Sequence, residues 1–547
     1  MKNFTAQNPI AYFSAEFGLK AELPVYAGGL GVLAGDILKE AADLEWPMIG
    51  IGLLYHGEES VQIITTEGNQ IETNNDYVPN EVGLELVMDG DRPLYIKVNL
   101  TQMEVWVQVW KYQVGKTVAL YLLDPDNERN HAHERRLAHA LYAGTEEELI
   151  KQQIILGVAG VKLLRALDIV PGIYHVNEGR PSFLHWQLIR SFMEHDDMSY
   201  RQAKKAAIDL TVYTNHTVVA AGNQTYDLDY MKVYGKYYAK KMGITVDELV
   251  KPGAVGDRFN VTNFALNVSR KASSVSKPHF EICKKQWPKY NWCNVTNAVH
   301  MPTWQNRSVL EVASDIEALW QHHREEKRRT MEYLHSLTGY VYDPEKLVIT
   351  WARRVATYKQ LDKLFEDIEA LQAILLSTER PVQLLVAGKA HVFDTKGKQI
   401  IREVIGCMSQ ELAGHALFIP NYNIDVGAAI TRGSDVWINT PVYGEEASAT
   451  SGMKAISNGV LQCTVTDGWC REVDWSDESI GWALDHKRLT ASFIETMKDK
   501  IVPKFYERDA NNMPKAWIKM MQKSIELSKY YSATRMLQDY ETKLYVK

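Results

Sequence analysis

The sequence predicts an α/β protein built from two doubly wound lobes with a cleft between them, and three observations lead to this prediction. Short apolar runs recur along the chain, and each ends in a polar or glycine-rich turn. Amphipathic stretches follow these runs, a pattern typical of βα units that form a parallel sheet covered by helices. The chain has 547 residues, which at roughly 150 residues per domain is enough for several domains. This is more βα units than a single sheet usually contains, so two lobes, each with its own sheet, are the simplest arrangement.

The expected strands follow one another in chain order, and each run ends in polar residues. They lie within the segments 172–179, 209–217, 346–354, 382–391, 415–422 and 435–441. Helices are expected between them at 147–167 and 361–376, and the last stretch, 515–547, also has a helical pattern.

Composition does not mark the boundary between the lobes. We place it near Asn297, between the similar segments 260–272 and 294–304. This gives an N-terminal lobe at 1–296, a C-terminal lobe at 297–514, and a C-terminal helical segment at 515–547 that we expect to pack across the lobes.

Composition and charge exclude several classes of protein. The 61 Lys and Arg against 68 Asp and Glu give a net charge of −7 without a basic run, so no nucleic-acid partner is expected. The five cysteines are irregularly spaced, which disfavours a disulfide framework and fits a reducing compartment. No signal peptide is recognisable, and the apolar runs are too short to span a membrane. We therefore expect a cytoplasmic protein that does not contact a membrane.

Polar residues at the ends of the expected strands are candidate ligand positions, because open α/β sheets bind ligands beyond the carboxyl ends of their strands. They are Asn177, Glu178, Asn215, His216, Arg353, Arg354, Lys389, His391 and Asn421. Strands also end at the surface, and for any single residue that explanation is the better one. For a series of such strand ends along the chain it is weaker.

A glycine motif, Gly28-Gly29-Leu30-Gly31, precedes a stretch with helical spacing of apolar residues. Glycines at the start of a helix let backbone N–H groups approach an anion. A tight loop that needs glycine for its backbone angles explains the motif about equally well.

A cationic motif directly follows the expected strand at 346–354. Arg353, Arg354, Tyr358 and Lys359 fall within residues 353–359. Arginine forks suit phosphate oxygens, and lysine adds a point charge. A solvated helix face is the alternative, and the position after a strand favours phosphate binding.

A third motif, at 445–454, combines small hydroxyl residues with Lys454 at the start of an expected helix, 454–461. A poorly solvated lysine beside other cations can lose its proton and form a Schiff base with an aldehyde cofactor. The hydroxyl and N–H groups of the motif could hold an anion. From chemistry alone, a surface turn capped by serine or threonine is the better explanation.

Other groups of residues in the sequence are weaker indications of function. His322 and His323 lie among charges and are expected on a solvated helix face. His131 and His133 lack strict metal-ligand spacing, so no metal site is expected. Neither G-x-S-x-G nor a Walker A motif is present, which leaves hydrolase and kinase functions without support.

Taken together, these segments resemble the glycogen and α-glucan phosphorylase family, in particular its short bacterial and archaeal branch. The matching pieces stand in family order and include YFSAEFGL (12–19), LPVYAGGLGVLAGDILKEAADL (23–44), YHVNEG (174–179), ARRVATYK (352–359) and EASATSGMKAISNGVLQCTVTDGW (446–469). The resemblance covers residues 10 to 490 approximately.

The resemblance implies two Rossmann-like lobes of the glycosyltransferase B type, with glucan on the N-terminal lobe and pyridoxal 5′-phosphate and substrate phosphate on the C-terminal lobe. The implied reaction is reversible phosphorolysis of α-1,4-glucan or maltodextrin by inorganic phosphate to α-D-glucose 1-phosphate, with retention of configuration. It also implies a homodimer. The allosteric sites of longer relatives are not expected in so short a chain.

The resemblance gives individual residues roles. The catalytic residues would be Arg354 and Lys359, which bind substrate phosphate, and His216, which would hydrogen-bond the sugar rather than transfer a proton. The residues implied to hold the cofactor are Lys454, Arg353, Thr450, Ser451, Tyr422 and Gly31. Those implied to face the glucosyl unit, besides His216, are Asn297, Glu446, Ser448, Ala449, Gly29 and Leu30.

Arg180, Ala298 and Ala449 depart from the pattern of the short branch, which has histidine, glycine and glycine there. These changes bear on acceptor preference and rate more than on the chemistry. Two alternatives stay open. A nucleotide-sugar glucosyltransferase of the glycogen synthase type would also suit the glycine loop and paired cations, although its paired-glutamate spacing is missing. A weakly catalytic glucan-binding protein is the other.

Overall fold

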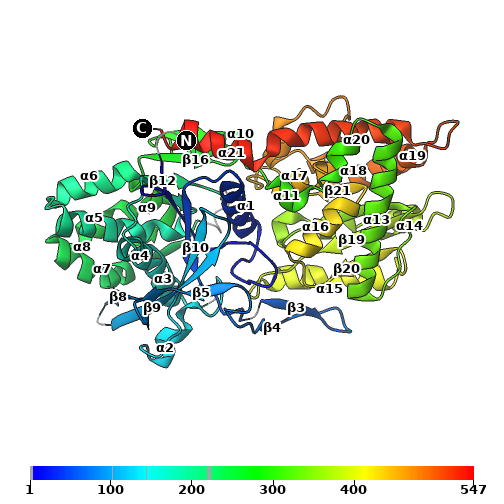
Figure 1. The fold of residues 1–547 in the computed structure, drawn as a ribbon. Coiled ribbons are helices and arrows are strands. Elements are labelled where there is room, and N and C mark those ends of the chain that lie inside the picture. The colour runs from blue at the N-terminus through cyan, green and yellow to red at the C-terminus, as the bar shows by residue number, and fades with distance from the viewer. Residues whose placement is uncertain (1–3, 59, 102, 143, 218–222, 547) are drawn as a thin grey trace. The chain divides into compact units, whose positions relative to one another are not determined.

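The structure, a computed structural model, describes residues 4–58, 60–101, 103–142, 144–217 and 223–546. Contacts divide the chain into two units. Unit 1 comprises Met1–Ser60, Asn74–Thr296 and Met536–Lys547, and unit 2 comprises Val61–Thr73 and Asn297–Arg535. Both are α/β units with sheets rich in parallel strands, which confirms the predicted class (Figure 1). Within the described ranges, no helix has both the length and the apolar character needed to cross a bilayer.

Unit 1 is built on a 10-stranded sheet with the order β17-β16-β12-β11-β1-β2-β10-β9-β5 and β8 beside β9. Strands β17 to β10 are parallel, and antiparallel pairing begins at β9. The bounds are β1 Ile10–Ser14, β2 Met48–Leu53, β5 Leu84–Leu86, β8 Tyr95–Leu100, β9 Met103–Gln113, β10 Ala119–Asp124, β11 Ile173–Asn177, β12 Thr211–Thr214, β16 Lys271–Ser274 and β17 Trp292–Asn294.

Apart from α21 near the end of the chain, the helices of unit 1 named here lie between these strands, as parallel connections require. They include α1 Gly29–Asp43, α3 Glu146–Ile154, α4 Gly160–Ala166, α5 Leu184–His195, α6 Tyr200–Leu210, α7 Leu228–Met242, α9 Val261–Asn267, α10 Lys277–Gln286 and α21 Ala533–Asp539, which runs on into unit 1 from unit 2. The helix expected at 147–167 is confirmed. Thr145 caps the start of α3, and a π-helical turn at Ile155–Ala159 joins α3 to α4.

Unit 2 contains a 6-stranded, wholly parallel sheet with the order β20-β19-β18-β21-β22-β23. The bounds are β18 Leu347–Ala352, β19 Val382–Ala387, β20 Ala416–Ile419, β21 Val436–Asn439, β22 Leu461–Val465 and β23 Gly481–Leu484. Along β18, Leu347, Ile349 and Trp351 enter one apolar cluster, whereas Val348 and Ala352 enter another. Because side chains alternate across a strand, this central strand has a core on each face.

The helices of unit 2 cover both faces of that sheet (Figure 1). The longer ones are α13 Ile316–Thr338, α14 Ile368–Leu375, α15 Thr395–Ser409, α16 Ile424–Gly433, α18 Leu489–Thr496 and α20 Lys515–Ser528, and the shorter ones include α11 Met301–Trp304, α12 Ser308–Val312, α17 Thr450–Ile456 and α19 Val502–Tyr506. The helix expected at 361–376 was wrong in its first half. The carboxylate of Asp367 accepts a hydrogen bond from the N–H of Ala370 at 3.1 Å, which starts α14 only at Ile368.

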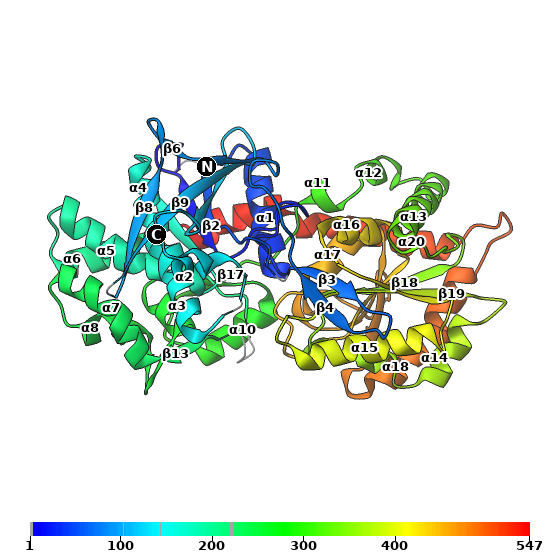
Figure 2. The ribbon, with the colours of Figure 1, turned by 90° about the horizontal axis from the view of Figure 1, so that it is seen from below.

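A hairpin packs with unit 2 although unit 1 flanks it on both sides in the sequence. It consists of the antiparallel strands β3, Val61–Ile64, and β4, Gln70–Thr73. Figure 2 shows it alongside α15. Sequence analysis did not anticipate this element.

A buried charge cluster ties α13 to the amino ends of β18 and β21. His323 Nε2 and Lys327 Nζ each lie 2.7 Å from the carboxylate of Asp435, which also accepts the N–H of Val348 at 2.7 Å. The expectation that His323 faces solvent was therefore wrong, because helical spacing puts it beside Lys327 on the buried face. Burial raises the pKa of Asp435, but Lys327 and the hydrogen bond from His323 outweigh burial and lower it overall.

We expect Asp435→Asn to lower the free energy of unfolding of unit 2 by about 3 kcal/mol, because Lys327 stays buried without its counter-charge. The folded pKa of Asp435 lies below its unfolded value, so its contribution is present above about pH 4 and is lost as pH falls through the folded pKa. The variant should therefore lose less stability on acidification than the wild type does. Urea unfolding followed by tryptophan fluorescence at pH 7 and pH 3 measures both effects.

The matched control is Glu332→Gln, which removes a carboxylate from the exposed ion pair with Arg328 on the same helix. It should leave the unfolding midpoint unchanged, since exposed ion pairs contribute little. Equal stability of Asp435→Asn and wild type at pH 7 would contradict the role given to the cluster.

Candidate functional site

In unit 1, three adjacent parallel strands end at the same edge of the sheet. Ser14 of β1, Asn177 of β11 and Thr214 of β12 stand in register. The structure thus places Asn177, and the residues Glu178 and His216 that follow the strands, along one edge. Parallel sheets of this kind bind ligands at that edge.

Glu178 organises the loops at this edge. Its carboxylate accepts hydrogen bonds from Tyr213 Oη at 2.9 Å, the N–H of His216 at 3.0 Å and Thr217 Oγ1 at 3.1 Å. Burial raises the pKa of Glu178, and these hydrogen bonds oppose the increase. The hydrogen bonds of the Glu178 carboxylate therefore stabilise the position of the segment that carries His216.

His216 is half-buried, and its ring is neutral. Its Nε2 lies 2.7 Å from Asn177 Oδ1, and Asn177 Nδ2 donates to Ser14 Oγ at 3.1 Å. This orientation makes Asn177 Oδ1 the acceptor, so Nε2 of His216 carries the proton. Burial, helped by the charge of His279, lowers the pKa of His216 to about 3. Such a ring takes part in hydrogen bonding near neutral pH and is not poised as an acid.

The glycine motif forms the first turn of α1, which begins at Gly29. The N–H groups of Ala27 and Gly28 donate to Glu16 Oε2 at 2.7 and 3.2 Å, so a carboxylate of the protein itself lies at this turn. A Cβ on Gly31 would lie 2.8 Å from the Cβ of Glu16. Gly31 has no positive φ, so close packing rather than an unusual backbone angle requires the glycine there.

In unit 2, the carboxyl ends of four neighbouring strands carry the predicted residues. Arg353 and Arg354 follow β18, Lys389 follows β19, Tyr422 comes shortly after β20, and Glu446 lies in the connection after β21. The parallel order of these strands brings these segments to one edge of the sheet.

Arg353 and Arg354 have opposite environments although they are neighbours. Arg353 is 8% exposed, its Nη2 donates to the carbonyl of Ile438 at 2.6 Å, and its guanidinium lies 5.3 Å from the ring of Trp351. Burial lowers its pKa, against the charge of Glu446. Arg354 is exposed, and after burial its charge is the main influence lowering the pKa of His391. Arg353 is therefore packed into the protein at this edge of the sheet, whereas Arg354 is exposed.

Lys359 is buried and forms an ion pair with Glu446, whose side chain is 10% exposed. The carboxylate of Asp467 holds the loop of this pair by accepting the N–H groups of Gly444 at 2.8 Å and Glu446 at 3.0 Å. Burial raises the pKa of Asp467. Sequence analysis did not single out Asp467, although its position just after β22 is the signal that identified the other strand ends.

Lys454 lies on α17 with 7% of its surface exposed, and its Nζ is 3.5 Å from the ring centroid of Trp304. The helix expected at 454–461 was wrong in its bounds. It begins at Thr450 and ends at Ile456, because the chain turns at Gly459, where φ is +84°, and enters β22 at Leu461. Lys454 is therefore in the last turn of the helix rather than the first.

The residues before Lys454 supply polar groups at the start of α17. Ser448 Oγ is buried and has no hydrogen-bond partner among the described residues. Ser451 Oγ accepts a hydrogen bond from Trp437 Nε1 at 3.2 Å, and Thr450 is the first residue of the helix. Ala449, which precedes it, has φ +65° and ψ +52°, a left-handed conformation that is costly for alanine.

Two further predicted residues of unit 2 differ in their surroundings. Burial raises the pKa of Tyr422 to about 12, against the charge of Arg353, so Tyr422 belongs to the cationic edge. Asn297 lies elsewhere along the chain, where its carbonyl accepts a hydrogen bond from Arg535 Nη2 at 3.2 Å. Its side-chain Oδ1 is buried, and within the described ranges no donor reaches it.

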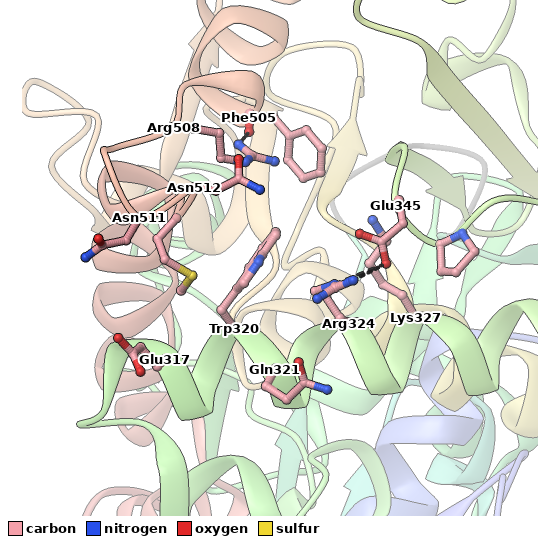
Figure 3. Close-up of a pocket in the computed structure, with 12 residues that line it drawn as sticks. Glu317, Trp320, Gln321, Arg324, Lys327, Glu345, Phe505, Arg508, Asn511 and Asn512 are labelled. Atoms are coloured by element: carbon pink, nitrogen blue, oxygen red, sulfur yellow. Dashed lines mark hydrogen bonds and ion pairs between the residues drawn. The ribbon is translucent and has the colours of Figure 1, made fainter.

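A separate cavity of about 600 Å³ lies between α13 and the segment after α19 (Figure 3). Trp320, Arg324, Phe505 and Arg508 are among the residues that line it. Lys327, which also lines it, donates to the carbonyl of Lys346 just before β18. The cavity is thus near the amino end of the strand whose carboxyl end carries Arg353.

Comparison with known proteins defines the class to which this fold and site belong. The model of the carbohydrate phosphorylase family matches residues 304–479. Maltodextrin phosphorylase of Thermococcus litoralis is 33% identical, over 99% of this chain and 71% of the relative. Glycogen phosphorylase of Aquifex aeolicus is 32% identical over 99% and 87%. An uncharacterized protein of Methanocaldococcus jannaschii is 30% identical over 98% and 99%.

The chain is therefore an enzyme of the glycosyltransferase class. It belongs to the carbohydrate phosphorylase family, as the resemblance of its motifs predicted. Enzymes of this family in general depend on pyridoxal 5′-phosphate.

We expect Ala449→Gly to raise the free energy of unfolding by up to about 1 kcal/mol. The left-handed backbone at this residue costs alanine roughly 1–2 kcal/mol, and the greater freedom of glycine in the unfolded chain offsets part of the gain. Urea unfolding measures the change. Ala510→Gly is the control, because Ala510 lacks a positive φ and should gain nothing. A variant at residue 449 that is less stable than wild type would show that the strain is not relieved.

Proposed function

We propose that this protein is a pyridoxal 5′-phosphate-dependent α-glucan phosphorylase. It cleaves α-1,4-glucan or maltodextrin reversibly with inorganic phosphate and releases α-D-glucose 1-phosphate with retained configuration. Membership of the family supports the proposal. The observation that carries it is the set of cations at the carboxyl edge of the unit 2 sheet, combined with Lys454 on the buried face of α17.

The residues of unit 2 fit a phosphorylated aldehyde cofactor. Arg353 Nε and Ser448 Oγ are buried polar atoms that lack a partner among the described residues, and such atoms have hydrogen bonds still to make. We assign Lys454 as the attachment point and Arg353, Thr450, Ser451 and Tyr422 as the residues around it. Gly31 is assigned to the same cofactor on the resemblance alone. When bound, the cofactor supplies a phosphate group that exchanges a proton with the substrate phosphate.

Arg354 and Lys359 bind the substrate phosphate in this proposal. Arg354 is exposed, and its fork can hold two phosphate oxygens. Lys359 is paired with Glu446, so an arriving phosphate competes with that carboxylate for Nζ. Glu446 is then released to accept a hydrogen bond from a sugar hydroxyl. The positive charge that develops on the sugar ring during cleavage is stabilised by the phosphate held nearby.

The sugar-binding roles of the remaining residues stay proposals that follow from the resemblance. The residues concerned are His216, Asn297, Ser448, Ala449, Gly29 and Leu30. The neutral ring of His216 suits hydrogen bonding to a sugar hydroxyl, and the buried, unpartnered Oδ1 of Asn297 suits acceptance of one. Arg354 and Lys359 supply charge, whereas these groups supply orientation.

We further propose the glycosyltransferase B architecture, with 1–296 as the glucan lobe, apart from the hairpin at 61–73 that packs with unit 2, and 297–514 as the cofactor and phosphate lobe. The segment 515–547 contributes to both units, since unit 2 ends at Arg535 and Met536–Lys547 belongs to unit 1. A homodimer is the oligomer that we propose.

Lys454 is the residue that we expect to carry the cofactor. After reconstitution with pyridoxal 5′-phosphate and reduction with borohydride, peptide mass mapping should find a pyridoxyl adduct on Lys454, and Lys454→Ala should abolish it. Lys389→Ala is the matched control, because burial lowers the pKa of Lys389 to about 8 and makes its amine the competing candidate. A label on Lys389 would contradict the attachment point. A protein that stays unlabelled would favour the nucleotide-sugar transferase or the glucan-binding protein instead.

Arg354 is the residue that we expect to bind substrate phosphate. Arg354→Ala should keep its bound cofactor but lose phosphorolysis by about 100-fold or more, because a charged contact to the reacting phosphate disappears. The assay follows glucose 1-phosphate formation from maltodextrin and inorganic phosphate. Arg380→Ala, which removes an exposed arginine elsewhere in unit 2, should have wild-type turnover. Normal turnover in Arg354→Ala would show that the phosphate site lies elsewhere.

A further inference from the structure

The hairpin β3–β4 has a reversed distribution of polar and apolar residues. Gln62 and Gln70 are buried, with 3% and 5% exposed, whereas Ile63 and Ile71 on the opposite face are 43% and 48% exposed. A hairpin that packs on a core ordinarily turns its apolar face inward. This one turns its glutamines inward beside Ile64, which packs against the apolar core, so buried hydrogen bonds contribute to how it is held in addition to apolar burial.

Gln62 uses all the polar groups of its amide. Its Nε2 donates to the carbonyl of Gly388 at 2.9 Å and to Gln70 Oε1 at 2.8 Å. Its Oε1 accepts the N–H of Asn421 at 2.8 Å. One side chain therefore joins the loop after β19 to the loop after β20.

The side-chain amide of Gln70 both donates a hydrogen bond to the backbone of a single residue and accepts one from it. Its Oε1 accepts the N–H of Ala390 at 3.0 Å, and its Nε2 donates to the carbonyl of Ala390 at 2.9 Å. Beside it, Glu72 forms an ion pair with Lys398 of α15 at 2.7 Å. The hairpin thus binds the loop after β19 through hydrogen bonds from two buried side-chain amides.

The loop after β19 lies directly against the cationic motif. Two backbone hydrogen bonds join them: Ala387 accepts the N–H of Arg353 at 3.1 Å, and Lys389 accepts the N–H of Val355 at 2.9 Å. Gly388 has φ +158°, and a Cβ there would come within 2.0 Å of the carbonyl oxygen of Arg353. A side chain at residue 388 would not fit, so the loop packs directly against the backbone of the arginine segment.

The loop after β20, which Gln62 also contacts, is likewise close in sequence to a residue of the candidate site. Asn421 has φ +53°, a left-handed conformation in which its N–H is held by Gln62. The next residue is Tyr422, whose pKa is affected by the charge of Arg353. Gln62 therefore constrains the two loops that follow β19 and β20, the strands on one side of β18 in the sheet.

We propose that Gln62 and Gln70 are positioning residues, which hold the loops after β19 and β20 in the arrangement where the Arg353–Lys359 motif binds phosphate. The inference rests on the proposed function. It goes beyond that function because the hairpin lies outside every motif that predicted the chemistry. A displacement of about 1 Å in a phosphate-binding group is enough to reduce the rate strongly.

The test compares Gln62→Met and Gln70→Met, which keep side-chain length but remove the amide, with Ile71→Thr on the exposed face of the same hairpin. In phosphorolysis of maltodextrin, both glutamine variants should raise KM for inorganic phosphate by about tenfold, the size expected for loss of a buried hydrogen bond. KM for maltodextrin should change less than about twofold. Ile71→Thr should match the wild type in both constants.

A second readout is independent of activity. Hydrogen exchange measured by mass spectrometry should become faster in peptides covering 388–391 in both variants. In peptides covering 421–422 it should become faster in Gln62→Met alone, because Gln70 does not contact that loop.

The outcomes separate the two proposals. A wild-type protein without phosphorolysis overturns the proposed function, and unchanged exchange in both variants would then overturn the positioning role as well. An active wild type with unchanged phosphate KM in both variants overturns the positioning role alone. A fall in kcat that only matches a loss of folded protein, with KM unchanged, has the same meaning, since it indicates a role in stability only. If Gln62→Met fails to fold, Gln70→Met is judged by the same criteria.

Discussion

The parallel register of β18 with its neighbours is the constraint on which unit 2 depends. Because β19, β18 and β21 run in the same direction, their carboxyl ends meet at one edge. Segments distant in sequence, those of Arg353, Lys389 and Glu446, are brought together for that reason. An antiparallel neighbour would have sent one of these segments to the opposite edge of the sheet.

Charges gathered in this way need compensation inside the protein, and the surrounding loops supply it. Arg353 is buried against a backbone carbonyl and an aromatic ring, and Lys359 is buried against Glu446. The glutamines of the hairpin extend the same principle to the backbone, whose N–H and C=O groups they satisfy. Buried polar groups must find partners, and here the partners also determine where the loops lie.

Much of the fold could be predicted from the sequence, and the errors have local causes. All six expected strands are present, because continuous apolar runs bounded by polar turns are a strong signal. The helix at 361–376 lost its first half to the capping carboxylate of Asp367. Lys454 came at the end of its helix rather than the start. The burial of His323 could not be foreseen, since its partner Asp435 is more than a hundred residues away.

The sequence by itself determined the class of fold, the strand ends and the motifs by which the family is recognised, because these depend on local periodicity and on residue type. Only the tertiary structure decided that Arg353 is buried while Arg354 is exposed, that Lys359 pairs with Glu446, and that residues 61–73 pack with unit 2. Each of these depends on contacts between distant segments. Such contacts form only when the sheet has aligned its strands, and no local pattern in the chain records them.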